Sequence, residues 1–327
     1  MKRTIARREW FSMDVFGIPL QGTHHFAHSN ERNRTGILLL TGFSTPRAAH
    51  GDSGVYWAQS FADSGYPSFR IDVPGSGDSG GDVFTESLPF ISAGGQGPVT
   101  VEIVKQLTER HGLNGVVIIG HCAGAISALF AAASCKECCG LVLMAPYFHV
   151  PQALRLKARR ALIDWATRSR MGGLLSRLYL RSRDFRPLLR TNIPPKNANR
   201  PLLGRCKELA SAGLPILVLK APGPKPSGTK PGTGEFDYLG YLVKMASSRN
   251  RIEVKTIEGV HHNFANHVGR TAVQQHVENW LAAFFPSQDC EEALVNAGLC
   301  TGPYINPAES SGLYRLRKTS FSEGHGL

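Results

Sequence analysis

Short apolar runs alternate with segments of helical periodicity along much of the chain. The runs are continuous rather than alternating, and glycine or proline bounds most of them, as is typical of strands buried on both faces. The predicted strands cover residues 36–43, 66–75, 115–120, 140–146, 214–220 and 251–257, and the predicted helices cover 54–64, 97–111, 123–134 and 271–285. Strands that alternate with helices predict a parallel sheet covered by helices on both faces. Residues 10–26 precede this pattern and predict an antiparallel hairpin.

The alternation is interrupted once, after Tyr147. The following residues predict helices separated by Gly172-Gly173 and by a proline pair, and strands return only at 214. We therefore predict one α/β domain with an insertion. The core covers 1–150 and 212–286, a helical cap covers 151–211, and 287–327 form a C-terminal tail. Residues 222–234 are too rich in Pro and Gly for regular structure.

Charge is concentrated in the predicted cap. The chain of 327 residues has a formal net charge of +12, and residues 153–207 hold 15 Lys and Arg against Asp164 and Asp184. A segment with this charge favours an anionic ligand, such as the acidic surface of an acyl carrier protein, the phosphates of coenzyme A or an anionic membrane surface. Arg155, Arg159 and Arg160 are the candidate contacts. The alternative is a solvated face that keeps the protein soluble.

Composition narrows the class of protein further. With 42% hydrophobic residues the chain can bury a full core, and no apolar stretch approaches the roughly 18 residues of a spanning helix. Seven cysteines and a start without a secretory signal predict a reduced, cytoplasmic protein without a disulfide framework. The basic residues are not interspersed with aromatic residues, and no nucleic-acid recognition helix accompanies them, so we expect no nucleic-acid partner.

We also expect no metal and no cofactor. Cys135 and Cys138 lack a second Cys or His pair at zinc spacing and are predicted to be core thiols. The glycines at 75, 77 and 80 match a dinucleotide fingerprint, but they do not follow the first strand of the unit.

The sequence Gly120-His-Cys122-Ala-Gly124 lies between a predicted strand and a predicted helix. A reactive side chain on so sharp a turn requires small residues two positions before and after it. The motif resembles the nucleophile elbow of the α/β-hydrolase fold, with Cys where most members have Ser, and the resemblance extends over residues 10–286. The alternative is a buried structural cysteine in a chance match.

The resemblance implies further site residues. Thr41-Gly42-Phe43 is similar to the loop after the third strand that carries an oxyanion-hole residue, although most members have His in place of Thr41. It implies that the backbone N–H groups of Phe43 and Ala123 form the oxyanion hole. His262 is similar to the catalytic histidine that follows the last strand, and His261 is the less favoured alternative.

The acid of a catalytic triad is expected after the strand at 214–220. Asp237 is our candidate and Glu235 is the second, although the Pro- and Gly-rich insertion displaces both from the usual position. If both are surface charges, the site works as a Cys122–His262 dyad.

Cysteine in place of serine carries a chemical implication. A thiolate paired with imidazolium attacks thioesters and activated esters more readily than amides. The motif is similar to those of dienelactone hydrolases and polyhydroxyalkanoate synthases, and neither matches over its full length. The sequence predicts an acyl-Cys122 enzyme that acts on an acyl thioester or ester, as a hydrolase (thioesterase or esterase) or an acyltransferase. The alternatives are a dienelactone-type hydrolase of lactones or C–C bonds, acting on a small anionic substrate, and a non-catalytic binding protein on the same scaffold.

Overall fold

A computed structural model of the chain describes residues 7–27, 35–42, 45–82, 87–150, 194–195, 197–222, 237–245 and 251–286. The Pro- and Gly-rich segment, most of the predicted cap and the predicted tail therefore lie outside the described residues.

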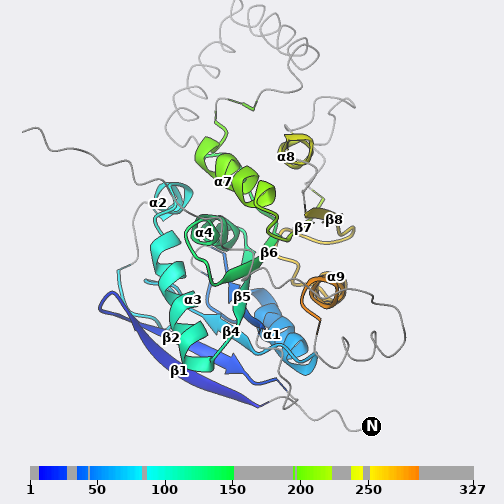
Figure 1. Ribbon diagram of the computed structural model, residues 1–327. Helices are drawn as coiled ribbons and strands as arrows, with labels where there is room; N and C mark the ends of the chain where they lie inside the picture. Colours follow the sequence, from blue (N-terminus) through cyan, green and yellow to red (C-terminus); the bar gives the residue numbers. More distant parts are fainter. Residues whose placement is uncertain are drawn as a thin grey trace, which may run out of the picture. The chain divides into compact units, whose positions relative to one another are not determined.

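An eight-stranded sheet forms the centre of the molecule (Figure 1). Its strands are β1 (Arg8–Val15), β2 (Ile18–His25), β3 (Thr35–Leu40), β4 (Ser68–Ile71), β5 (Gly115–His121), β6 (Cys138–Met144), β7 (Ile216–Lys220) and β8 (Ile252–Thr256). They lie in the order β1-β2-β4-β3-β5-β6-β7-β8. β2 pairs antiparallel with both β1 and β4, and all other pairs are parallel. The predicted N-terminal hairpin and mostly parallel sheet are confirmed.

Helices cover both faces of this sheet (Figure 1). They are α1 (Ser53–Asp63), α2 (Ser87–Ser92), α3 (Gly97–His111), α4 (Ala123–Ala132), α7 (Arg200–Ser211), α8 (Tyr238–Met245) and α9 (His267–Phe284), with a short 3-10 helix, η1 (His50–Asp52), before α1. α1 and α9 pack on one face, and the others pack on the opposite face. α2 and α8 are short, and the apolar pattern of the sequence did not predict them.

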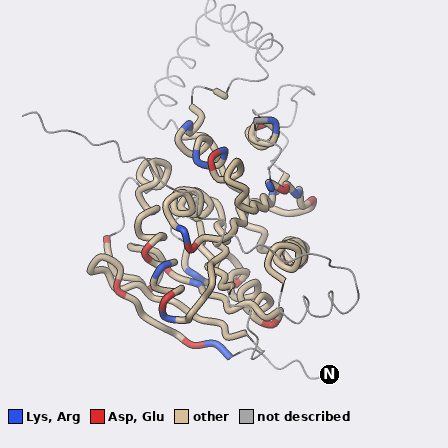
Figure 2. Tube along the Cα trace, viewed as in Figure 1, with Lys and Arg blue, Asp and Glu red and all other residues tan. Residues whose placement is uncertain are grey.

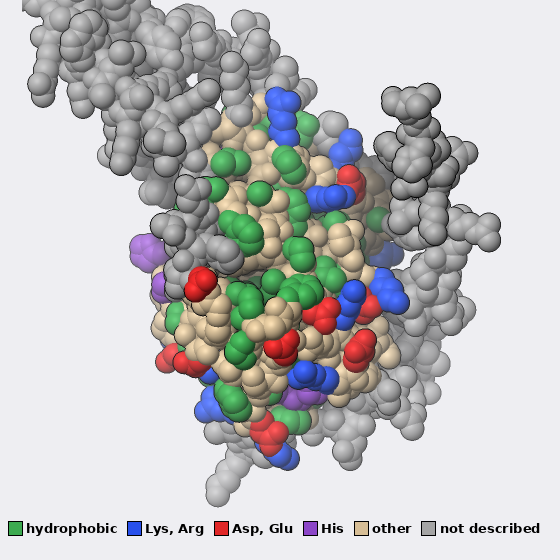
Figure 3. Space-filling view, turned by 90° about the vertical axis from the view of Figure 1, so that its left-hand side faces the viewer, with side chains coloured by type: hydrophobic (Ala, Val, Ile, Leu, Met, Phe, Trp, Pro, Cys, Tyr) green, Lys and Arg blue, Asp and Glu red, His purple; other side chains and the backbone are tan. Residues whose placement is uncertain are grey.

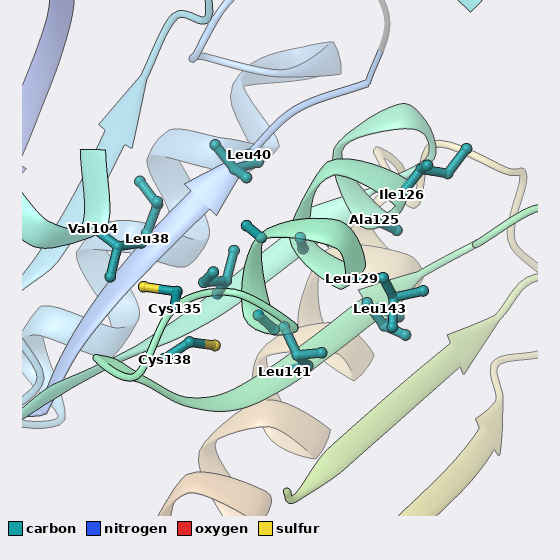
Figure 4. Packing of buried hydrophobic residues seen from close by; sticks show 14 of the residues in the cluster. Leu38, Leu40, Val104, Ala125, Ile126, Leu129, Cys135, Cys138, Leu141 and Leu143 are labelled. Carbon is teal, nitrogen blue, oxygen red and sulfur yellow. The ribbon is translucent and has the colours of Figure 1, made fainter. Parts of the chain in front are cut away.

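Successive side chains along a strand point to opposite faces of the sheet, so the hydrophobic core has two layers. In β3, Leu38 and Leu40 point toward α3 and α4, whereas Ile37 and Leu39 point toward α1 and α9. All four are at most 5% exposed. Strands covered on both faces need apolar residues at every position, which is why these runs are continuous. Figure 4 shows the layer between β3, β6 and the helices α3 and α4.

Cys135 and Cys138 fit the prediction of core thiols. Cys135 and Cys138 are 5% and 6% exposed and pack beneath α4 (Figure 4). Cys206 of α7 is 1% exposed. Burial raises the pKa of Cys135 and of Cys206 to about 12, so these thiols stay protonated at neutral pH.

The basic insertion is the segment between Val150 and Asn197, and its two ends meet beside β6. Val150 donates a backbone hydrogen bond of 2.8 Å to Asn197, and Asn199 donates one of 2.8 Å to Phe148. The chain therefore leaves the core and returns to it at one point, just beyond the carboxyl end of β6. α7 lies in the range predicted for the cap, and the structure packs it on α4 through Leu202 and other buried apolar residues.

Acidic and basic side chains are present in equal numbers in the described residues. They are interspersed along the trace (Figure 2) and over the face seen in Figure 3. The net positive charge of the chain thus belongs to residues outside the described ranges, among them Arg155, Arg159 and Arg160. No helix in the described part is long and apolar enough to cross a membrane.

Candidate active site

Cys122 occupies the turn between β5 and α4. Its φ of 55° and ψ of −112° place it in a strained region of backbone space that non-glycine residues rarely adopt. The backbone N–H of Cys122 donates 2.9 Å to the carbonyl of Met144 on the neighbouring β6. The turn is therefore held by the sheet, as a side chain on a sharp strand-to-helix elbow requires.

Gly120 and Gly124 make this turn sterically possible. A Cβ on Gly124 would lie 2.5 Å from the carbonyl oxygen of Leu40 and 2.6 Å from that of Thr41. A Cβ on Gly120 would collide with the carbonyl of Gly124 and the backbone of Ala125. Both glycines of the motif are thus required by close backbone approach, which is the reason inferred from the sequence.

The elbow lies where the strand order of the sheet changes direction. β3 is followed along the chain by β4 on one side, and β5 lies on its other side. Ligands of open α/β sheets bind at the carboxyl ends of the strands at such a point. Gly42, just after β3, lies beside Cys122, since a Cβ at Gly42 would be 3.3 Å from Cβ of Cys122. Phe43, the first predicted oxyanion donor, lies outside the described residues.

His262 is held in a loop between β8 and α9. Asn266 caps α9 by accepting 2.8 Å from the N–H of Gly269, and its amide donates 3.1 Å to the carbonyl of Gly259. Phe264 is fully buried and has a φ of 51°. One buried aromatic ring and one bridging amide therefore fix the path of the loop around His262.

This loop meets the elbow through His121. Nε2 of His121 lies 2.9 Å from the backbone carbonyl oxygen of His262, and the ring centroids of these two histidines are 5.3 Å apart. The structure thus brings the His262 loop to the residue next to Cys122. Burial is the main cause of the lowered pKa of both His121 and His262, and His50, at the start of η1, makes a smaller contribution to each. His50 was not singled out from the sequence, because its proximity depends on the tertiary structure.

Local electrostatics favour a neutral thiol and a neutral imidazole. Burial raises the pKa of the Cys122 thiol, and the backbone N–H of Ala123 opposes this increase. Partial burial and the nearby His50 lower the pKa of His262. Both directions oppose the thiolate–imidazolium pair expected from the sequence. Ala123, whose N–H is a predicted oxyanion donor, is the first residue of α4.

The hydroxyl group of Tyr147 lies close enough to Cys122 and to Ser92 for both to affect its pKa. Burial, with a smaller contribution from Cys122, raises the pKa of Tyr147 to about 12. Ser92, at the end of α2, faces the same hydroxyl and opposes this increase, but neither oxygen has a partner with hydrogen-bond geometry within the described ranges. Asn199 anchors Ser92 by donating 2.7 Å to its carbonyl. Neither residue was singled out from the sequence.

Asp237 caps a helix. Its Oδ1 accepts 3.1 Å from the N–H of Gly240 at the start of α8, and its side chain is exposed. In the described part of the chain no hydrogen bond or ion pair joins it to His262. Glu235 lies outside the described residues, so the assignment of the acid stays a prediction. Among the described residues no three His, Cys, Asp or Glu side chains gather as a metal site.

An elbow after β5, a histidine loop after the last strand and an eight-stranded, mostly parallel sheet together define the α/β-hydrolase class of fold. The sequence profile described as "Alpha/beta hydrolase family" matches residues 37–285, and the chain belongs to this family. No curated protein matches the sequence.

Solved structures with the same fold include several hydrolases. The Pyrococcus furiosus esterase Pf2001 is 14% identical, with a TM-score of 0.55 over 86% of this chain and 92% of the esterase. Est1E from Butyrivibrio proteoclasticus, with ferulic acid bound, is 14% identical, with a TM-score of 0.52 over 84% of this chain and 98% of Est1E. The α/β hydrolase GrgF from a Penicillium species is 16% identical, with a TM-score of 0.56 over 85% of this chain and 99% of GrgF. At these identities the likeness establishes the fold.

Proposed function

We propose that this protein is a cysteine-dependent hydrolase that forms an acyl-Cys122 intermediate from a thioester or ester. The observation that carries the proposal is the strained backbone of Cys122 at the turn between β5 and α4. Strain of this kind costs about 1–3 kcal/mol and persists where surrounding structure over-determines it, which is typical of functional sites. A merely structural thiol would not need such a conformation.

The proposed reaction begins with a neutral pair. His262 accepts the thiol proton as Sγ of Cys122 attacks the carbonyl carbon, because the direction of both pKa shifts disfavours prior charge separation. The N–H groups of Ala123 and Phe43 are the proposed donors to the oxyanion. As the tetrahedral intermediate collapses, the bond to the leaving oxygen or sulfur breaks and His262 returns the proton to it. Water, activated by His262, then hydrolyses the acyl-enzyme. Another nucleophile in place of water would make the protein an acyltransferase.

The acid is proposed to be Asp237, with Glu235 second and a dyad as the alternative. The helix-capping bond of Asp237 favours the dyad. Comparing Asp237→Asn with Glu235→Gln separates these cases. A selective loss of kcat in one variant identifies the acid, and equal small effects establish the dyad.

The substrate is proposed to carry a negative charge, on an acyl carrier protein or on coenzyme A. In support, both ends of the basic insertion are joined beside the carboxyl end of β6. This is the edge of the sheet at which Cys122 lies. The esterase Pf2001 and the ferulic acid bound to Est1E support an ester or a related acyl compound as the reacting group.

Intact-protein mass spectrometry tests the proposal. The protein is mixed with acyl thioesters and p-nitrophenyl acetate, and we expect an added mass equal to one acyl group. Cys122→Ala should show neither adduct nor turnover, while Cys206→Ala, at a buried thiol of α7, should keep both. Turnover by Cys122→Ala above a few per cent of wild type would exclude covalent catalysis. Opening of a lactone by the wild type without any acyl transfer from thioesters would favour the dienelactone-type alternative, and inertness toward every substrate would favour a binding protein.

A further inference from the structure

His121 links the two halves of the proposed site. It ends β5 and directly precedes Cys122, and its side chain is 9% exposed. Its Nε2 lies 2.9 Å from the carbonyl oxygen of His262. The residue that adjoins the nucleophile on the chain is therefore bonded to the backbone of the proposed base.

The direction of this hydrogen bond follows from chemistry. A carbonyl oxygen can only accept, so Nε2 of His121 carries the proton. Burial lowers the pKa of His121 to about 4, so the ring is neutral at pH 7 and Nδ1 is unprotonated. The titratable groups that face the ring are His262 and His50. A Cβ on Gly42 would lie 3.6 Å from Nδ1, so the loop after β3 packs against the other side of the ring.

Orientation of His262 needs an explanation. In a triad a carboxylate bonded to the histidine ring holds its orientation. Within the described ranges no carboxylate contacts the His262 ring, and the Asp237 side chain is bonded to Gly240 instead. The loop is held by contacts of its backbone and of two residues that follow His262, Phe264 and Asn266.

We propose that His121 is a positioning residue, which orients His262 toward Cys122 by holding the His262 carbonyl through its Nε2–H. Because the backbone at His262 is fixed, only the two side-chain torsions of the base remain to be set. This inference rests on the proposed function, because it assigns a role in aligning the base for proton transfer. It predicts that the hydrogen-bond donor, rather than the ring, is what the enzyme requires.

His121→Gln and His121→Met form a matched pair for the test. Both side chains reach about as far as Nε2 of His, but only Gln has an N–H donor there. The full-length chain is assayed with p-nitrophenyl acetate from pH 5 to 9. For His121→Met we expect kcat to fall at least tenfold with KM within twofold of wild type. We also expect the rate to keep rising with pH, because hydroxide replaces the misaligned base. His121→Gln should stay within threefold of wild type and keep the neutral plateau.

Controls separate this inference from the proposed function. His267→Met, at an exposed position in the first turn of α9, should behave as wild type. Cys122→Ala and His262→Ala should be inactive, and activity in either would overturn the proposed function itself. If both are inactive but the Met and Gln variants at 121 behave alike, the positioning role is excluded. Circular dichroism measures the folded fraction of each variant. A loss of activity that is uniform over pH and matches the loss of folded protein would likewise show that His121 is only a structural residue.

Discussion

At the scale of single residues, the proposed nucleophile, Cys122, is a thiol in a setting that discourages its ionisation. The Cys122 side chain is partly buried, and the pKa of His262, the proposed base, is lowered. A thiol is more acidic than a hydroxyl, so a neutral base can deprotonate it during attack even where a free thiolate is scarce. Chemistry of this type resembles general-base catalysis by a serine hydrolase more than attack by a preformed thiolate.

The pH dependence of catalysis tests this neutral pair. Below the pKa of His262 the imidazolium cannot accept a proton, and this pKa is lowered from 6.5. We therefore expect kcat/KM for p-nitrophenyl acetate to be half-maximal below pH 6.5 and level at neutral pH. Alkylation of Cys122 by iodoacetamide should be half-maximal above pH 9, because the thiol pKa is raised. Rapid alkylation at pH 5–6, absent in Cys122→Ala, would instead establish a thiolate–imidazolium pair.

At the scale of the elements, β5 and α4 meet with no space for a side chain at either flanking glycine. The carbonyls of β3 lie directly against Gly124, so the loop after β3, the elbow and α4 form one packed unit. Relief of a collision there would require a shift of β3 against β5, which six residue pairs hold in parallel register. Small changes in this unit should therefore displace Cys122 itself.

Alanine substitutions test the packing of the elbow. Gly124→Ala should lower the free energy of unfolding by about 1–3 kcal/mol, because the added methyl group meets two carbonyl oxygens. Gly204→Ala is the matched control, since a Cβ at this position in α7 would meet nothing within 4 Å. It should raise stability by about 0.5–1 kcal/mol, as glycine is unfavourable within a helix. Urea denaturation measures both, and equal effects would contradict the role of close packing.

At the scale of the whole molecule, several histidines are buried in neutral form. Burial lowers the pKa of His24 to about 3 and that of His25 to about 4. His24 stacks on Phe69 with 4.4 Å between ring centroids, and its Nε2 has no hydrogen-bond partner in the described part of the chain. The unfolded chain binds protons at these residues below about pH 6.5, whereas the folded protein does not. Their contribution to stability is complete above pH 6.5 and is lost as the pH falls toward 4.

Acid unfolding of His24→Phe tests this linkage. The variant keeps an aromatic ring against Phe69 and removes one titrating group. We expect the free energy of unfolding to decline less steeply between pH 6.5 and 4 than in wild type, by at most about 1.4 kcal/mol per pH unit. His267→Gln, at an exposed histidine, serves as the control. A slope for His24→Phe identical to wild type would show that His24 is protonated in the folded protein.

The distribution of charge over the molecule leads to a kinetic prediction. The positive excess lies outside the described residues, in and around an insertion that begins beyond β6. Replacing Arg155, Arg159 and Arg160 together by Gln should lower kcat/KM for a coenzyme A thioester and flatten its salt dependence, with little change in kcat. Attraction of this kind acts on encounter and is screened beyond about 8–10 Å at physiological salt.

A neutral N-acetylcysteamine thioester provides the matched substrate for that experiment. It carries no phosphate and should respond little to the triple substitution. Equal responses of the two substrates, or an unchanged salt dependence, would reduce the basic insertion to a feature that favours solubility.

The sequence by itself determined the sheet, the elbow and the order of the site residues along the chain. Buried strands need continuous apolar runs, and a strand-to-helix turn such as that at Cys122 needs glycines on both sides, so both features are local and can be recognised in the sequence. The short helices α2 and α8 were missed because six and eight residues give little periodicity.

The tertiary structure alone decided which side chains meet. The bond from His121 to the His262 carbonyl joins residues 141 positions apart, and His50 reaches the same place from a third segment. The raised pKa of Cys122 and the lowered pKa of His262 likewise result mainly from burial, which depends on the packed molecule. Asp237 lies in the order along the chain that is expected of the acid, but its side chain caps α8. Chain order restricts the candidates, but proximity and desolvation arise only when the strands and loops are assembled.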